Sequence, residues 1–274
     1  PSREPENEEP GQAGVPLALF SDTRLGTCTL PVSLGVPMPR GLLRDTARLV
    51  VEQDVGNQSD PGDWRPVPAQ FDVRDRWYRE GSIRWVGVSF DAEYRQGFPA
   101  RYRMRWTGET TAPEPDRPLR VEESDADLIV TTGPARFRLS KTAFRLVDAA
   151  WLDRDGDGRF VDDEQLVRAA ESDGLVYENG DQTVFTTAHA RNRFRLLEVG
   201  PKRAVVAVDG WYEDAKGNPE CRHTTRLFFS QGSQTVRIRH TWINTVDTGK
   251  GHPRVRDIHL SVGVPGSARY AFGG

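Results

Sequence analysis

Hydrophobic and polar residues alternate along much of the chain with the period of two that is typical of half-buried β-strands. The clearest case is the segment 101–106, in which Tyr102, Met104 and Trp106 alternate with three arginines. The few segments with helical periodicity are short. The pattern therefore predicts an all-β protein.

The predicted strands fall into two sets. The first set covers 15–20, 28–36, 46–53, 67–77, 82–90 and 101–106. The second covers 119–122, 128–132, 136–140, 144–152, 183–188, 194–199, 203–212, 221–229, 235–244 and 257–264. In 82–90 several apolar side chains compete for one buried face, so we expect a β-bulge near Gly87. The regular spacing of the second set, with glycine-containing turns between strands, predicts an antiparallel β-sandwich.

Proline-rich and charged stretches suggest the domain limits. The chain begins without Met in a charged, proline-containing stretch, which we interpret as the end of a cut fragment with a disordered tail over 1–14. Residues 15–109 form the first β-module in this interpretation. Residues 110–118 contain three prolines and form a linker, and 119–274 form the sandwich.

Composition narrows the function classes. The 274 residues include 26 glycines and 19 prolines, which favour a turn-rich β-protein. The net charge of −3 gives no field that would attract nucleic acid or an anionic membrane, and no apolar run is long enough to span a bilayer. Cys28 and Cys221 match no zinc spacing, which leaves either one disulfide or two free thiols.

One acidic stretch, 153–164, has the spacing of a calcium-binding loop. The pattern D-x-[DN]-x-[DN]-G-x5-E is matched by Asp153, Asp155, Asp157, Gly158 and Glu164. Calcium takes six to eight oxygen ligands, which alternating side chains on a tight loop supply. The simpler alternative is an acidic turn between two strands, because Asp and Gly favour turns in any context.

The remaining ligands and the flanks define the kind of site. We expect the carbonyl of Arg159 to bind the ion, Glu164 to donate two oxygens, and a water to stand at the position of Val161. Strand periodicity precedes the loop, and a short helix over 162–171 is expected after it. Strand flanks on one side argue against a calcium sensor. The sequence therefore predicts a structural Ca²⁺ site at the end of a strand.

Three separated motifs carry a family resemblance. The segments 31–41 (PVSLGVPMPRG), 67–70 (VPAQ) and 76–85 (RWYREGSIRW) resemble, in the same order, the N-terminal RIFT-type barrel of exo-rhamnogalacturonan lyase-like (YetA-like) proteins. The chain departs from that family at 78–80, where Tyr-Arg-Glu replaces the Pro-Asp before Gly-Ser. The resemblance implies a RIFT-type barrel over 15–109 and a central β-sandwich from 119 onward.

The same resemblance implies the biology. It places the chain in a secreted, extracellular or periplasmic protein that acts on pectic, rhamnogalacturonan-type polysaccharide. It also implies a downstream catalytic α/α-toroid in the full-length protein. No catalytic residue carries over from the family. The function is then either the N-terminal β-region of a polysaccharide lyase-like enzyme or a calcium-stabilised, non-catalytic carbohydrate-binding or adhesion module.

A lyase needs a base and a cation that stabilises the developing charge. The candidate bases are His189, His223, His240, His252 and His259, followed by Lys141 and Tyr212. His223 and His240 lie on neighbouring predicted strands beside Arg222, Arg226 and Arg239, either as a site or as a solvated sheet face. Trp64, Trp77 and Trp85 either bind sugar rings or, as we expect, pack in the core.

Overall fold

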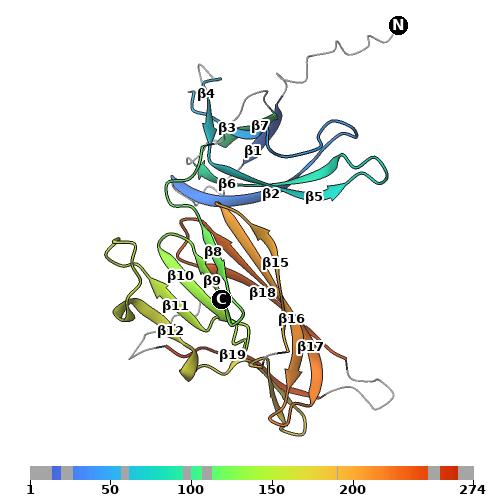
Figure 1. Cartoon of the computed structure of the whole chain (residues 1–274), viewed down its shortest axis with the longest axis vertical. Coiled ribbons are helices and arrows are strands. Elements are labelled where there is room, and N and C mark those ends of the chain that lie inside the picture. Colours follow the sequence, from blue (N-terminus) through green and yellow to red (C-terminus); the bar gives the residue numbers. More distant parts are fainter. Residues whose placement is uncertain are drawn as a thin grey trace. The chain divides into compact units, whose positions relative to one another are not determined.

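The computed structural model describes residues 14–19, 27–56, 62–94, 100–106, 113–189, 191–245 and 254–264. Its described residues form β-strands and two short 3-10 turns, which confirms the all-β class (Figure 1). The chain divides into two compact units with the boundary between Asp116 and Arg117, and each is described by itself. The predicted tail, except for Gly14, and residues 110–112 of the predicted linker lie outside the described residues.

The first unit contains two antiparallel sheets. One has the order β1-β7-β3-β4 and the other the order β2-β6-β5. The strands of the first sheet are β1 (Val15–Leu19), β3 (Leu49–Asp54), β4 (Trp64–Val67) and β7 (Ala100–Trp106). Those of the second are β2 (Cys28–Pro37), β5 (Ala69–Arg76) and β6 (Ile83–Tyr94). Within the described residues the two ladders remain separate sheets, so the RIFT-type barrel stays a prediction.

The core of this unit lies between its two sheets. Tyr102 and Met104 of β7 are buried, as the alternation in 101–106 predicts, and they share a hydrophobic cluster with Val88 and Phe90 of β6. A register irregularity does lie near Gly87, as predicted. Gly87 itself pairs with Asp72, and the extra residue belongs to β5, where the register shifts between Val73 and Asp75, opposite Val86 and Trp85 of β6.

The second unit is an antiparallel β-sandwich. Its five-stranded sheet has the order β12-β11-β10-β9-β8, and the larger sheet runs β18-β17-β16-β14-β13-β19 with β15 paired to β16. The first sheet contains β8 (Arg120–Glu123), β9 (Asp127–Thr131), β10 (Ala135–Ser140), β11 (Ala149–Leu152) and β12 (Gln165–Arg168). The second contains β13 (Gly174–Asn179), β14 (Val184–Thr186), β15 (Arg193–Val199), β16 (Arg203–Glu213), β17 (Pro219–Ser230), β18 (Val236–Ile243) and β19 (Val255–Ser261).

Alternating side chains from both sheets fill the sandwich core. Phe137 and Leu139 of β10 share a cluster with Tyr177 of β13 and Phe229 of β17. The rings of Phe137 and Phe229 lie 5.4 Å apart between centroids. Burial of such aromatic and aliphatic side chains is the main source of stability for a domain of this size.

Two predicted elements around the acidic loop are wrong. The expected strand 144–152 is shortened to Ala149–Leu152, because Leu146 has φ +79°, a left-handed conformation that an extended strand cannot contain. The expected helix 162–171 is a 3-10 turn (Asp162–Glu164), the strand β12 and a second 3-10 turn (Ala169–Glu171). Pairing of β12 with β11 satisfies backbone groups that a helix would otherwise bond internally.

Candidate functional site

The acidic loop is the connection of a β-hairpin. β11 ends at Leu152, directly before Asp153, and β12 begins at Gln165, directly after Glu164. The two strands pair antiparallel, with Ala149 opposite Arg168. Gly156 and Gly158 both have φ +78°, so the sharp turn expected at Gly158 is present and is shared with a second glycine. The prediction that a strand precedes the loop is therefore met, and a strand follows it too.

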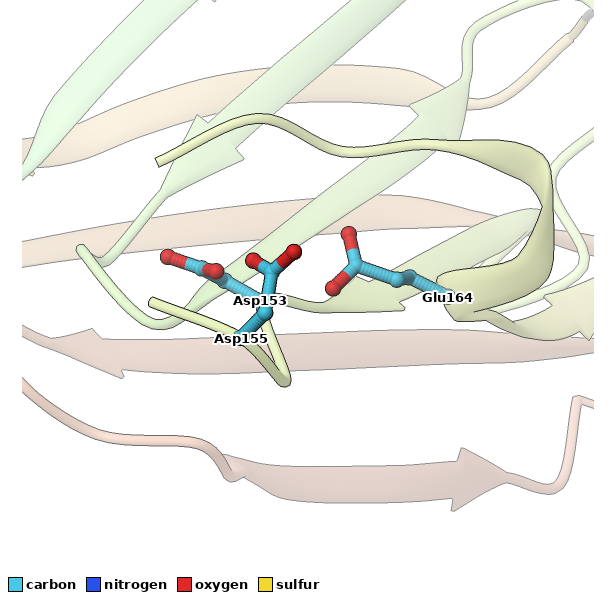
Figure 2. Close-up of side chains that lie close together, drawn as sticks. All are labelled: Asp153, Asp155 and Glu164. Carbon is cyan, nitrogen blue, oxygen red and sulfur yellow. The ribbon is translucent and has the colours of Figure 1, made fainter. Parts of the chain in front are cut away.

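Three of the four predicted carboxylates converge. One carboxylate oxygen each from Asp153, Asp155 and Glu164 lies within 4.8 Å of the other two. Figure 2 shows Glu164 extending toward the two aspartates from the opposite side of the loop. Two oxygens bound to one calcium ion at about 2.3–2.6 Å lie at most about 5 Å apart, so this spacing fits a single ion.

The loop backbone holds these carboxylates in place. Asp153 accepts hydrogen bonds from the amides of Gly156 (2.8 Å) and Gly158 (3.1 Å). Glu164 accepts one from the amide of Arg154 at 2.7 Å. Each bond uses only part of the lone-pair capacity of a carboxylate, which leaves oxygen lone pairs for a cation.

The other predicted ligand positions do not converge with these three carboxylates. The Asp157 carboxylate accepts a hydrogen bond from the amide of Arg159 at 2.7 Å and lies outside the converging group. The Arg159 side chain is exposed, as is Val161, where water was expected to complete the shell. Metal binding by all five residues remains a prediction, and the converging trio is the part whose geometry fits it.

Charge around the trio is unbalanced. The side chains of Asp153 and Glu164 are buried, and the Arg117 guanidinium approaches Asp153 only at 4.0 Å from a side chain that is 62% exposed. Buried carboxylates at this separation repel one another unless a cation or a proton compensates them. A hard dication with oxygen ligands meets that requirement.

The larger sheet contains a second polar group, buried in the sandwich. The Tyr212 hydroxyl lies 2.9 Å from Nε2 of His240, and Nδ1 of His240 lies 2.9 Å from Oγ1 of Thr225. Thr225 lies 3.3 Å from Nδ1 of His223, whose Nε2 lies 2.9 Å from Oδ1 of Asn192. The prediction that His223 and His240 approach one another is confirmed, because their rings stack with centroids 5.8 Å apart.

Asn192 fixes the direction of this chain of hydrogen bonds. Its amide nitrogen donates to the carbonyls of Thr187 and His189, both at 2.8 Å, so its oxygen faces His223 and accepts. His223 then donates from Nε2 and accepts at Nδ1 from Thr225, which in turn accepts from Nδ1 of His240. Both imidazoles are therefore assigned as neutral, and every donor has one acceptor.

Burial keeps these groups neutral. It lowers the pKa of His223 to about 3, with further lowering from the neighbouring His240 and His189 and opposition from Asp209. Burial also lowers the pKa of His240 and raises that of Tyr212. A solvated sheet face is thus the wrong description of His223, which is 1% exposed. The three nearby arginines, Arg222, Arg226 and Arg239, are exposed and lie on the opposite face of the sheet.

The other candidate bases have different surroundings. His189 bonds the carbonyl of Trp211 through Nε2 and accepts from the amide of Arg191 at Nδ1, so both nitrogens are used. Lys141 donates to Glu123 and to the carbonyl of Ser124. His252 lies outside the described residues. His259 is exposed, and Nδ1 lies 2.6 Å from Oδ2 of Asp257.

The three tryptophans considered as sugar-binding candidates lie outside the hydrophobic core. Trp85 is 38% exposed, and Trp64 and Trp77 are half-buried, which corrects the expectation of core packing. An arginine side chain covers each of the last two, Arg103 over Trp64 at 4.1 Å and Arg84 over Trp77 at 5.2 Å. Among the described residues of the first unit, the buried aromatic ones are Phe90, Tyr94 and Tyr102.

Cys28 and Cys221 are both free thiols, and burial raises the pKa of Cys221. None of the described helical segments has the length and hydropathy of a membrane span.

Comparison with known proteins identifies the sandwich. No curated protein matches the chain. The family model of the PcRGLX-like protein central beta sandwich domain matches residues 119–270. This range begins just before β8 and contains every strand of the second unit, together with the acidic hairpin and the buried histidines. The chain therefore belongs to the rhamnogalacturonan lyase-like PcRGLX family and carries its central β-sandwich domain.

Proposed function

We propose that this chain is the N-terminal β-region of a secreted polysaccharide lyase-like protein that acts on pectic, rhamnogalacturonan-type polysaccharide. Membership of the rhamnogalacturonan lyase-like family is the observation that carries this proposal. In this role the first unit is a RIFT-type barrel, and the sandwich supports and binds the saccharide. Secretion places the protein in an extracellular or periplasmic compartment.

Catalysis in this proposal belongs to a downstream α/α-toroid. The described residues form no α-helix, and the buried histidines use their ring nitrogens in a satisfied, neutral network. A general base must reach the proton that it removes, within about 3 Å or through one water. His223, at 1% exposure, lacks that access.

The acidic hairpin contributes a structural Ca²⁺ site to the proposal. Asp153, Asp155 and Glu164 would hold the ion, and Asp157 and the Arg159 carbonyl are the further ligands that the loop spacing predicts. Binding joins the start of β12 to the end of β11, so the ion holds the edge hairpin of the five-stranded sheet closed. An ion enclosed by protein oxygens has no open position for a substrate, which favours structure over catalysis.

The experiment that tests this function is a lyase assay on rhamnogalacturonan with protein that includes the toroid. Elimination creates an unsaturated product whose ultraviolet absorbance rises with time. Activity with that protein, and none with this chain alone, supports the proposal. The second candidate, a calcium-stabilised binding or adhesion module without catalysis, is favoured by the converging carboxylates of the hairpin. It predicts saccharide or surface binding and no unsaturated product from either protein.

A further inference from the structure

A pocket of about 450 Å³ lies within the second unit, and neither the converging carboxylates of the acidic hairpin nor the side chains of the histidine network line it. Its floor is the outer face of the larger sheet. Val176 of β13 lies directly between Thr186 of β14 and His259 of β19, which makes a row across three strands. Glu178 stands two residues further along β13 on the same face. The row arises from strand register and has no local sequence motif.

The wall beside Arg145 depends on unusual backbone geometry. Gly174 has φ +76°, and a Cβ at this position would stand 2.6 Å from Cα of Arg145. Leu146, the next residue, is 3% exposed and has φ +79°. A left-handed conformation is strained in a bulky residue, and such strain is concentrated at binding and catalytic sites. The fold therefore holds Arg145 against the pocket at an energetic cost.

His259 is a fixed polar group in this pocket. In its neutral form the ring donates from Nδ1, which is 2.6 Å from the Asp257 carboxylate, and presents Nε2 as an acceptor. No described residue supplies a hydrogen-bond partner for Nε2. Among the described histidines it has the one ring nitrogen left for a ligand, because His189, His223 and His240 use both of theirs.

The charges of the lining favour a neutral ligand. Two carboxylates, Asp173 and Glu178, face one guanidinium, that of Arg145. Arg145 is already 3.6 Å from the buried carboxylate of Asp148, whereas Glu178 is paired with Arg256 at 3.1 Å. A uronate carboxylate would meet a negative surface, but sugar hydroxyls donate well to carboxylate and imidazole acceptors.

The apolar part of the lining is made of short side chains. These are Ala169, Ala170, Ala188, Val176 and Val184. No aromatic ring apart from the imidazole of His259 lines the pocket, so no indole or phenyl platform is present for stacking on a pyranose. Alanine and valine methyl groups suit a small branched apolar group, such as the methyl of a 6-deoxyhexose.

We propose that this pocket binds one neutral sugar residue, preferably a 6-deoxyhexose such as rhamnose, through His259, Asp173, Glu178 and Arg145. The choice of saccharide class rests on the proposed function, and the selection against uronate rests on the pocket itself. The volume is at the small end for ligand sites, as expected for a single sugar unit.

Nuclear magnetic resonance titration of the purified chain tests this proposal. The probes are methyl α-L-rhamnopyranoside and, as the charged comparison, galacturonate. The expected result is a saturable shift of the amide signals of Val176, Thr186 and His259 with the rhamnoside, and none with galacturonate. Absence of a saturable shift with the rhamnoside, or tighter binding of galacturonate, overturns the proposal.

Variants at exposed positions locate the binding. His259→Ala removes the acceptor, and Ala170→Phe fills the pocket from an exposed position, so both are expected to weaken rhamnoside binding at least tenfold. Glu122→Gln, an exposed carboxylate on β8, is the control and should bind as the parent does. Unchanged binding in both pocket variants overturns the site. The lyase assay is a separate test. If protein that includes the toroid releases no unsaturated product while this chain still binds the rhamnoside, the proposed function fails and the pocket proposal stands.

Discussion

The hydroxyl of Tyr212 and Nε2 of His240 lie 2.9 Å apart inside the sandwich, and the bond runs in one direction, from tyrosine to histidine. The direction follows from Asn192 at the far end of the chain of hydrogen bonds, through Thr225 and His223. A proton added to either imidazole places two donors face to face or removes the acceptor of Thr225. The network is therefore complete only when both rings are neutral.

Stability should fall as the pH is lowered through the range in which free histidine titrates. The folded pKa values of His223 and His240 are depressed, so below about pH 6.5 the unfolded chain takes up protons that the folded chain does not. The loss is at most about 1.4 kcal/mol per pH unit for each histidine. Two neighbouring groups also affect the pKa of His223, which His189 lowers and Asp209 raises. Urea unfolding at several pH values measures this slope.

A matched pair of variants tests whether His223 causes this dependence of the unfolding free energy on pH. His223→Gln should flatten the dependence of unfolding free energy on pH, although it also lowers stability at neutral pH. Tyr78→Phe, at a residue that is 83% exposed and does not titrate in this pH range, should keep the slope of the parent. Equal slopes in the parent and His223→Gln would contradict this account.

Tyr212→Phe should destabilise the sandwich by about 1–3 kcal/mol, because it leaves Nε2 of His240 buried without a donor. Chemical denaturation of the parent and the variant measures the difference. Tyr78→Phe is the control, since Tyr78 is 83% exposed and no change is expected there. Equal effects at the two positions would mean that the hydroxyl of Tyr212 contributes nothing to stability.

Calcium should raise the melting temperature of the chain. At 100 times its dissociation constant a ligand stabilises the folded state by about 2.7 kcal/mol. Magnesium should do less, because it requires tight octahedral geometry and retains water. Thermal unfolding with calcium, magnesium or chelator measures the effect.

Glu164→Ala should abolish the calcium response, because it removes one of the three converging carboxylates. Glu122→Ala, outside the loop, should respond as the parent does. If chelator leaves the parent unchanged, or if Glu164→Ala still responds, the hairpin connection is an acidic turn and binds no ion.

Gly174→Ala should cost more than a positive φ alone explains. Gly174 (φ +76°) and Gly232 (φ +74°) share a backbone conformation, but a Cβ would contact Arg145 only at Gly174, with nothing within 4 Å at Gly232. Gly232→Ala therefore measures the conformational term, about 1–2 kcal/mol. The excess at Gly174, measured by denaturant unfolding, reports the close approach of the Arg145 segment. Equal losses would show that this segment moves freely aside.

The chain alone should release no unsaturated product from rhamnogalacturonan. Its described residues include no α-helix, and the buried histidines are committed to their network. Ultraviolet absorbance over time, compared with a boiled sample, measures this. Product formed above the boiled control would place a working base in this chain and would make His259 the first residue to test.

The strands were predictable where a single face is buried. The alternation in 101–106 located β7, and that in 221–229 located β17. β13 was missed, because Leu175, Val176 and Tyr177 are all buried, on two faces, and show no alternation. The expected helix after the loop failed because apolar residues over only two turns fit a strand and a 3-10 turn equally well.

The candidate site was predictable only in part. The spacing of 153–164 located the acidic hairpin, since its ligands are local in sequence. The approach of His223 to His240 followed from adjacent strands, but their burial did not. The pocket could not be predicted from the sequence, because Arg145, Val176 and His259 are far apart along the chain and meet only through the folding of the sandwich.

The network also constrains how the sheet assembles. Tyr212 comes from β16, His223 and Thr225 from β17, and His240 from β18, where it pairs with Thr225. If β18 slipped by one residue against β17, His240 would turn to the outer face. Tyr212 would then remain in the interior without its acceptor and Thr225 without its donor, a penalty that apolar side chains would not impose. The hydrogen-bonded network of Tyr212, His240, Thr225 and His223 therefore favours the observed register of β16, β17 and β18 over registers shifted by one residue.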